Sequence, residues 1–117
     1  MKPGCVFCQI VGGQIPSVIR LRNQHAILID DRKPMAPQHA LVIPVEHWGN
    51  LGDLIPGEYE DLLPDVFQLI DDYVCQEGIL NSGFRVIINS GPDAGQTVHH
   101  LHFHVLGGAL LKNDFGA

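Results

Sequence analysis

The chain has 117 residues, of which 45% are hydrophobic and 17% charged, and its formal net charge is −6. This length and hydrophobic content fit one compact domain over residues 1–117. Its 7 basic residues are scattered among 13 acidic ones, which excludes a partner bound mainly through nucleic-acid phosphates but leaves room for a small anionic ligand. No apolar run approaches the roughly 20 residues of a membrane span and no hydrophobic signal region begins the chain, so we expect a cytoplasmic protein that binds no membrane.

Hydrophobic periodicity predicts a mixed α+β domain. A short helix is expected over Val6–Val11, ended by Gly12 and Gly13. Strands are expected over residues 18–21, 26–29, 39–44, 84–89 and about 98–106, where apolar runs alternate with turn-forming segments. Together these elements predict an antiparallel meander of about five strands that packs against one long helix.

The long helix is expected from about residue 57 to residue 77. Its apolar residues recur at helical spacing, and Gly78 supplies a C-terminal stop. These apolar residues are Leu62, Leu63, Val66, Phe67, Ile70, Tyr73 and Val74. Pro64 lacks a backbone donor, which predicts either a kink or a helix that begins near it. Cys75 lies in the same apolar pattern and is expected to be a buried core thiol.

Three histidines alternate with hydrophobic residues near the end of the chain. His100, His102 and His104 belong to a stretch that, with His99, holds four of the seven histidines. Because side chains in a strand point to opposite faces in turn, the three would share one face while their hydrophobic neighbours face a core. Two neighbouring imidazoles of this kind either chelate a zinc ion or bracket a phosphate.

The segment before the histidines carries groups suited to a phosphate. It supplies amide, hydroxyl and closely approachable backbone donors from Asn89, Ser90, Gly91, Gly95, Gln96 and Thr97. No Lys or Arg lies between Ile87 and Leu111, so charge that develops on a phosphate must be met by neutral donors and histidine. This favours a histidine-based phosphoryl or nucleotidyl mechanism without a metal at the reaction centre.

The run His100-Leu-His102-Phe-His104-Val-Leu resembles the motif of the histidine triad (HIT) superfamily. Residues 7–16, 36–44 and 89–108 are similar to its Hint (histidine triad nucleotide-binding) branch. The resemblance implies the HIT fold, a homodimer and a nucleotide-binding hydrolase that cleaves purine nucleoside phosphoramidates such as adenosine 5′-monophosphoramidate through a covalent nucleotidyl-histidine. A dinucleoside polyphosphate hydrolase of the Fhit-like branch and a nucleotide-binding regulatory module stay open as alternatives. The long helix argues against a third, an all-β cupin with a metal on His100 and His102.

The resemblance also implies a role for each site residue. His102 is the nucleophile, His104 holds the phosphate, and His100 supports His102. The phosphate pocket comprises Asn89, Gly95, Gln96 and Thr97. The nucleoside lies against Phe7, Ile10, Ile15 and Ile29, and Asp31 holds the ribose hydroxyls. Arg32 stands where the family usually has an apolar residue beside the base.

Cys5 and Cys8 form a Cys-x-x-Cys pair at metal-ligand spacing, and three cysteines are an odd number for a disulfide framework. Resemblance to zinc-carrying bacterial HIT proteins implies that His47 and His100 complete a structural zinc site, with His99 as the reserve fourth ligand. Four protein ligands leave no open position for a catalytic water. No organic cofactor is expected.

Two further histidines are interpreted more simply. His25 is expected to be structural, as a lone histidine usually is. His39 opens the strand over residues 39–44 and either supports the active site or makes a structural hydrogen bond.

Overall fold

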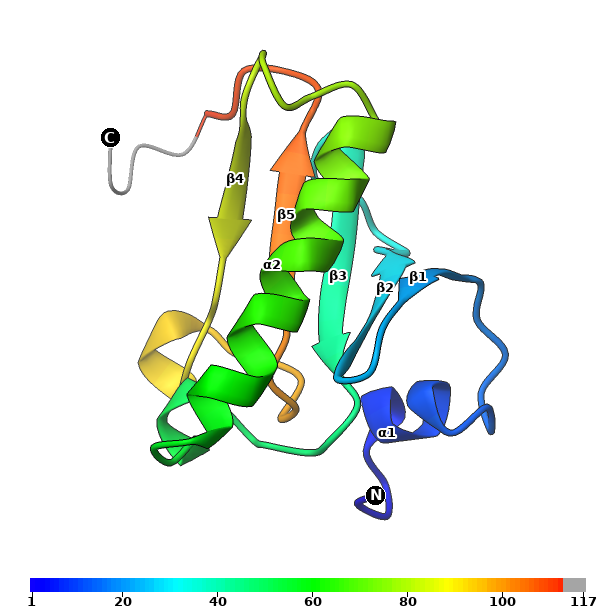
Figure 1. Cartoon of the computed structure of the whole chain (residues 1–117), viewed down its shortest axis with the longest axis vertical. Helices are drawn as coiled ribbons and strands as arrows, with labels where there is room; N and C mark the ends of the chain where they lie inside the picture. The colour runs from blue at the N-terminus through cyan, green and yellow to red at the C-terminus, as the bar shows by residue number, and fades with distance from the viewer. Residues whose placement is uncertain (113–117) are drawn as a thin grey trace.

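The computed structural model describes residues 1–112, and the remaining residues of the expected 1–117 domain lie outside the described part. Helices and strands follow one another as drawn in Figure 1. Their bounds are α1 Val6–Val11, β1 Ile19–Arg22, β2 Ala26–Asp30, β3 Gln38–Pro44, α2 Glu58–Gln76, β4 Phe84–Ile87 and β5 Phe103–Gly107, with short 3-10 turns η1 Leu51–Asp53 and η2 Pro92–Ala94. The α+β class is confirmed, and α1 has the predicted bounds. No helix of this part is long and apolar enough to cross a membrane.

The strands form one antiparallel five-stranded sheet in the order β1-β2-β3-β5-β4. The predicted meander is wrong in one respect, since a meander would place β5 at the edge of the sheet, whereas β4 lies there instead. The chain leaves β3, passes through α2 to the far edge as β4, and returns as β5 between β3 and β4 (Figure 1). The histidine-bearing strand therefore has hydrogen-bonded neighbours on both sides.

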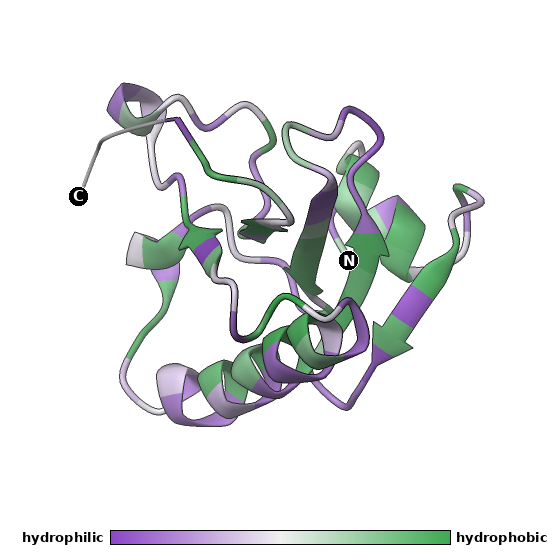
Figure 2. Cartoon of the chain, turned by 90° about the horizontal axis from the view of Figure 1, so that it is seen from above, coloured by the Kyte–Doolittle hydropathy of each residue, from purple (hydrophilic) through white to green (hydrophobic). Residues whose placement is uncertain are grey.

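The sheet buries apolar side chains on both faces, with α2 along one face and α1 along the other (Figure 2). Alternate residues of each strand go to opposite faces. The core under α2 takes Ala26, Leu28, Ala40, Val42, Phe103 and Val105 from the sheet. The core under α1 takes Ile27, Ile29, Leu41 and Ile43, with Phe7 and Ile10 from the helix. Since α1 packs on residues of β2 and β3, the part of this face formed by β5 and β4 is covered by no helix within residues 1–112.

Helix α2 begins before Pro64, so the alternative start near that proline is wrong. Glu58 fixes the first turn because its carboxylate accepts from the Ile55 backbone N–H at 2.8 Å and from the Trp48 indole N–H at 3.2 Å. The predicted stop at Gly78 is confirmed. Gly78 has a φ of 69°, and the N–H of Ile79 donates to the carbonyl of Val74 at 3.0 Å, as in a Schellman motif.

Two predicted core residues of α2 are exposed instead. Phe67 is 53% exposed, and the Cys75 thiol is also exposed, which corrects the expectation of a buried thiol. The buried stripe follows Leu62, Val66 and Leu69, continuing to Ile70, Tyr73 and Val74. Phe67 and Cys75 are apolar in sequence but fall outside this stripe of i, i+4, i+7 and i+8 positions.

The histidine strand is shorter than predicted. It begins at Phe103 and not near residue 98, and β4 ends at Ile87 and not at residue 89. Before β5 the backbone contacts a loop, since the N–H of Leu101 donates to the carbonyl of Trp48 at 2.7 Å. The alternation of faces nevertheless extends outside the strand, because Leu101 packs in the core under α2.

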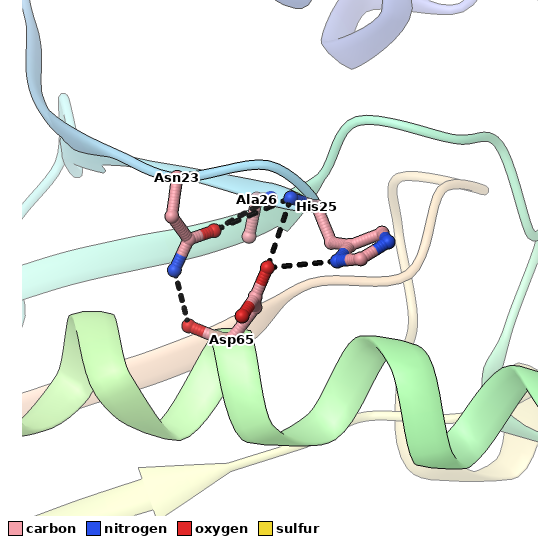
Figure 3. A network of polar contacts seen from close by, with 4 residues as sticks. All are labelled: Asn23, His25, Ala26 and Asp65. Carbon is pink, nitrogen blue, oxygen red and sulfur yellow. Dashed lines mark hydrogen bonds and ion pairs between the residues drawn. The ribbon is translucent and has the colours of Figure 1, made fainter.

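A polar network joins the β1–β2 turn to α2 (Figure 3). Asp65 accepts from Nδ1 of His25 at 2.7 Å and from the His25 backbone N–H at 3.2 Å. The amide of Asn23 donates to the carbonyl of Asp65 at 2.9 Å, and its oxygen accepts from the N–H of Ala26 at 3.1 Å. His25 is thus structural, as predicted.

Candidate functional site

A cavity of about 390 Å³ opens between α1, the ends of β2 and β3, and the segment before β5. We call it the histidine cavity. It is lined by Val6, Phe7, Ile10, Ile29, Asp30, Asp31, Arg32, Lys33, Leu41, Asn89, Gly95, Gln96, Thr97, Val98, His102 and His104. Its volume suits a small-molecule ligand. Of the residues expected around a nucleotide, only Ile15 is missing from the lining. Ile15 is partly buried and packs against the core under α1.

His102 has a defined tautomer in this cavity. Its Nδ1 lies 2.7 Å from the backbone carbonyl of His100, which only accepts, so Nδ1 carries the proton. Nε2 is then left with its lone pair. His102 is only 7% exposed, and its ring makes a T-shaped contact with the ring of Phe7, with centroids 5.1 Å apart. The sequence motif does not show which carbonyl accepts this proton, because it does not tell where the neighbouring backbone carbonyls point.

His104 has the opposite tautomer to His102, because a hydrogen bond from His39 sets it. The N–H of Met35 donates to Nδ1 of His39 at 3.0 Å, so the proton of His39 sits on Nε2 and is directed at Nδ1 of His104, 2.9 Å away. Nε2 of His104 must therefore carry a proton and act as a donor. Burial is the largest cause that lowers the pKa of His104 to about 4. The neighbouring rings of His102 and His39 add to the effect, and the carboxylate of Asp31 opposes it.

Asp31 lies at the outer end of this chain of contacts. One carboxylate oxygen accepts from the backbone N–H of Lys33 at 2.8 Å, and the other lies 3.3 Å from Nε2 of His39. Burial lowers the pKa of His39, and Asp31 opposes that effect. Arg32 is exposed on the cavity rim. Sequence reasoning missed Leu41, whose signal was its place two residues after His39 on the same strand face.

Gln96 organises the loop that leads to the histidines. Its side chain is buried and accepts from the N–H of Gly91 at 2.8 Å. Its amide group donates to the carbonyls of Gly49 at 2.6 Å and Val98 at 3.0 Å. All of its side-chain hydrogen-bonding groups are thus engaged within the loop. The glycine needed here is Gly95, whose φ of 79° disfavours residues with a side chain.

A second cluster lies beside the histidine cavity, where Cys5, Cys8, His47 and His100 converge. Nδ1 of His100 lies 3.3 Å from the Cys5 sulfur, 3.5 Å from the Cys8 sulfur and 3.1 Å from Nδ1 of His47. Nε2 of His100 donates to the carbonyl of Pro44 at 2.9 Å, so Nδ1 presents a lone pair to the cluster. The exposed His99 is not among the clustered residues.

The donor set of this cluster fits a zinc ion. A tetrahedral zinc with two sulfur and two nitrogen ligands separates its ligand atoms by roughly 3.3–3.8 Å, close to the distances above. Burial lowers the pKa of His47, and burial lowers the pKa of His100 to about 4, which keeps both rings neutral as metal binding requires. Burial raises the pKa of the Cys5 thiol, an effect that a bound cation would offset.

The rings of His100 and His102 face different sites, the first the cluster of Cys and His residues and the second the histidine cavity. Nδ1 of His100 faces the thiols, whereas Nδ1 of His102 donates to the His100 carbonyl. The two rings therefore do not present lone pairs to one common ion. This geometry contradicts the cupin-type alternative, in which His100 and His102 share a catalytic metal.

Fold and site together define an α+β protein in which the buried His102 and the half-buried His104 line a cavity of ligand size. A family model for the HIT domain matches residues 12–110. A HIT-like protein from Chlamydia pneumoniae is 40% identical over 91% of this chain and 94% of its own length. The chain belongs to the HIT domain family.

Two solved structures are informative neighbours. A HIT family hydrolase from Clostridium thermocellum is 38% identical with a TM-score of 0.90, over 97% of this chain and 98% of that chain. A zinc-bound histidine triad family protein from Mycobacterium smegmatis is 35% identical with a TM-score of 0.74, over 88% of this chain and 73% of that chain. The HIT fold is thereby shown for this chain.

Proposed function

We propose that this protein is a nucleotide-binding hydrolase that cleaves purine nucleoside phosphoramidates, such as adenosine 5′-monophosphoramidate, through a covalent nucleotidyl-histidine on His102. One observation carries the proposal. The His100 carbonyl holds the proton of His102 on Nδ1, and this leaves a nucleophilic Nε2 in a cavity of ligand size. The neighbour from Clostridium thermocellum, named as a HIT family hydrolase, supports the reaction class.

In the first step the lone pair on Nε2 of His102 forms a bond to phosphorus, and the bond from phosphorus to the amine breaks with its electron pair on nitrogen. That nitrogen takes a proton from water and departs as the free amine. The imidazole becomes positively charged as the bond forms, and the His100 carbonyl 2.7 Å from Nδ1 stabilises that charge. His102 need not move, since its ring is fixed by this hydrogen bond and by Phe7. In the second step water attacks phosphorus and releases His102 and the nucleoside monophosphate.

The non-bridging phosphate oxygens need donors in both steps. Nε2–H of His104 is one, because His39 holds Nδ1 of His104 as an acceptor. Asn89, Gly95 and Thr97 line the same cavity and supply amide, backbone and hydroxyl donors. Gln96 was expected to bind the phosphate, but its side chain holds the loop through its own hydrogen bonds.

The nucleoside would occupy the end of the cavity lined by Phe7, Ile10 and Ile29. These apolar side chains suit a planar base. Asp31 lines the same cavity, and its two carboxylate oxygens accept from ribose hydroxyls alongside their present donors. Arg32 on the rim gives the base a cationic neighbour.

Cys5, Cys8, His47 and His100 would hold a structural zinc ion, for which the zinc-bound neighbour offers a precedent. Bound zinc would fix α1 to the segment before β5 and supply folding free energy. The thiols also favour a reducing compartment, and we place the protein in the cytoplasm on that basis. We further propose a homodimer, for which the edge strand β4 offers unpaired backbone groups.

The test is a single-turnover reaction with adenosine 5′-monophosphoramidate. Release of AMP, together with an acid-quenched adduct mapped by mass spectrometry to His102, is the expected result. His102→Asn should abolish both, whereas His25→Asn, a change at a structural histidine far from the cavity lining, should preserve both. An adduct on another residue, or turnover by His102→Asn, would contradict the mechanism. Size-exclusion chromatography with light scattering tests the dimer.

A further inference from the structure

The two cysteines of the cluster of Cys and His residues differ in their access from solvent. A cavity of about 400 Å³ lies beside this cluster and is lined by Cys5 and His47, but not by Cys8 or His100. We call it the N-terminal cavity. Cys5 is partly exposed, whereas Cys8 is only 2% exposed. A small reagent that enters the N-terminal cavity therefore meets the thiol of Cys5 and not that of Cys8.

The surroundings of Cys5 suit a reactive thiol. Lys2 and His99 line the N-terminal cavity, whereas no Asp or Glu does. The backbone N–H of Cys8 also donates to the Cys5 sulfur at 3.4 Å, and such a donor stabilises negative charge on sulfur. Reactive cysteines are found in partly exposed, acid-free surroundings of this kind. Cys5 is therefore the member of the pair that an incoming reagent attacks.

The spacing of the two cysteines also suits a disulfide bond. Cys5 caps the N-terminus of α1, and Cys8 lies in the first turn of that helix. Residues at this spacing have Cα atoms roughly 5 Å apart, within the range of roughly 4.4–6.8 Å that a disulfide spans. The two sulfurs belong to a set of ligand atoms that lie within 4.8 Å of one another. They need to approach by no more than roughly 3 Å to form the bond, which side-chain rotation supplies.

We propose that Cys5 and Cys8 are an oxidation site for peroxides, in which Cys5 is oxidised first and Cys8 then closes a disulfide with it. The proposal rests on the proposed zinc site, since the disulfide and a zinc ion exclude each other by using the same two sulfurs. Disulfides that form in a reducing compartment are mostly transient and serve catalysis or redox sensing. Oxidation of the pair therefore links exposure to a peroxide to loss of the metal site.

The two oxidation steps balance with a peroxide as the only co-reactant. In the first step the Cys5 sulfur attacks one oxygen of hydrogen peroxide, the O–O bond breaks, and water leaves with the thiol proton, so that Cys5 becomes a sulfenic acid. In the second step the Cys8 sulfur attacks the Cys5 sulfur and the S–O bond breaks. The departing hydroxide takes the Cys8 thiol proton as a second water. The two thiols are oxidised to one disulfide, and the peroxide is reduced to water.

The experiment uses the whole chain with Cys75→Ser, which removes the exposed third thiol. Reduced protein is freed of metal by chelation, treated with hydrogen peroxide and digested with trypsin. The tryptic peptide that ends at Arg20 carries both remaining cysteines, and we expect it to lose two hydrogen atoms and to resist alkylation until a reductant is added. The oxidised protein should bind no zinc before reduction. Zinc held at about ten times its dissociation constant should slow the oxidation about tenfold, because only the metal-free fraction reacts.

Two further variants in the Cys75→Ser background test the order of attack. Cys8→Ser should hold the oxidation at Cys5 as a sulfenic acid, which dimedone labels, whereas Cys5→Ser should leave Cys8 unlabelled. Equal labelling of the two variants would overturn the assignment of Cys5 as the attacked thiol.

The protein with both thiols intact tests the pair itself. If peroxide closes no disulfide within one chain, or joins separate chains only, Cys5 and Cys8 are not an oxidation site of this kind. Zinc binding by the reduced protein is a separate readout. Its absence would refute the proposed zinc site and the exclusion of zinc by the disulfide, while closure of the disulfide would still assign the oxidation to this pair.

Discussion

The backbone carbonyl of His100 accepts the Nδ1 proton of His102 at 2.7 Å, while the side chain of His100 faces the cluster of Cys5, Cys8 and His47. His100 therefore takes part in the Cys and His cluster through its ring and fixes the tautomer of His102 through its carbonyl. Whatever fixes the ring of His100 also fixes the carbonyl that orients His102.

Cys8→Ser should lose the metal and lower the melting temperature by about 10 °C, as expected for a few kcal/mol in a domain of this size. Turnover should fall as well, because the segment around His100 loses an anchor. Metal analysis and thermal melting check this, with Cys75→Ser as the control that changes an exposed thiol. A Cys8→Ser protein with full metal content and an unchanged melting temperature would refute the zinc site.

His39→Ala should lower kcat by about 10- to 100-fold with little change in KM. The cause is loss of the hydrogen bond that holds Nδ1 of His104 as an acceptor, an effect of about 1–3 kcal/mol. His39→Gln, which restores a donor near the position of Nε2, should recover part of the loss. Steady-state kinetics with the phosphoramidate measures both. Equal effects of the two variants would indicate that His39 acts only through packing.

The sequence predicted elements well where periodicity alone decides, as in α1 and the stop of α2 at Gly78. The prediction from sequence was wrong where contacts between distant segments determine the structure. Phe67 and Cys75 look like core residues because they are apolar, but the position of the buried stripe depends on which side of α2 meets the sheet. The strand order failed for the same reason, since no local signal tells β5 to insert between β3 and β4.

The site shows the same division. Spacing and resemblance brought out His102, Asp31 and the four clustered Cys and His residues, which the fold brings into the expected neighbourhoods. The histidine tautomers could not be predicted from the sequence, because they depend on backbone partners such as the His100 carbonyl and the Met35 N–H. Gln96 was predicted from its amide as a phosphate ligand, whereas its buried amide holds the loop.

Cys75 should react with a maleimide in the native protein, whereas Cys5 and Cys8 should react only after unfolding or chelation. The physical reason is exposure, since Cys75 is exposed and Cys8 is buried within the cluster. Mass spectrometry should find one labelled thiol in the native protein and all 3 cysteines labelled after unfolding. Native Cys75→Ser should take up no label. Rapid labelling of Cys8 in the native, metal-loaded protein would contradict this arrangement.

Stability should fall as the pH is lowered from about 6.5 toward about 4. In the unfolded chain His104 has a pKa near its ordinary value of 6.5, whereas burial lowers the pKa to about 4 in the folded protein. Between these values the unfolded state binds the extra proton, so the free energy of unfolding decreases with decreasing pH and becomes independent of this group below about pH 4. Urea unfolding at about pH 7 and about pH 5 measures the change.

His104→Asn should show a shallower pH dependence than the wild type, with both proteins metal-loaded. His39, His102 and Asp31 face His104 and are retained in this comparison. If the two proteins lose equal stability over this range, His104 is not the group responsible.

Gln96→Ala should lower the free energy of unfolding by about 2 kcal/mol, because it leaves half-buried backbone partners at Gly49, Gly91 and Val98 without their hydrogen bonds. Gln96→Glu should be no better, since it places an oxygen opposite the carbonyls of Gly49 and Val98. Gln68→Ala is the matched control on the exposed side of α2, where a change of at most about 0.5 kcal/mol is expected. Urea unfolding measures all three, and KM for the phosphoramidate should rise only in the Gln96 variants. A stable Gln96→Ala protein with an unchanged KM would show that the loop holds its shape without this side chain.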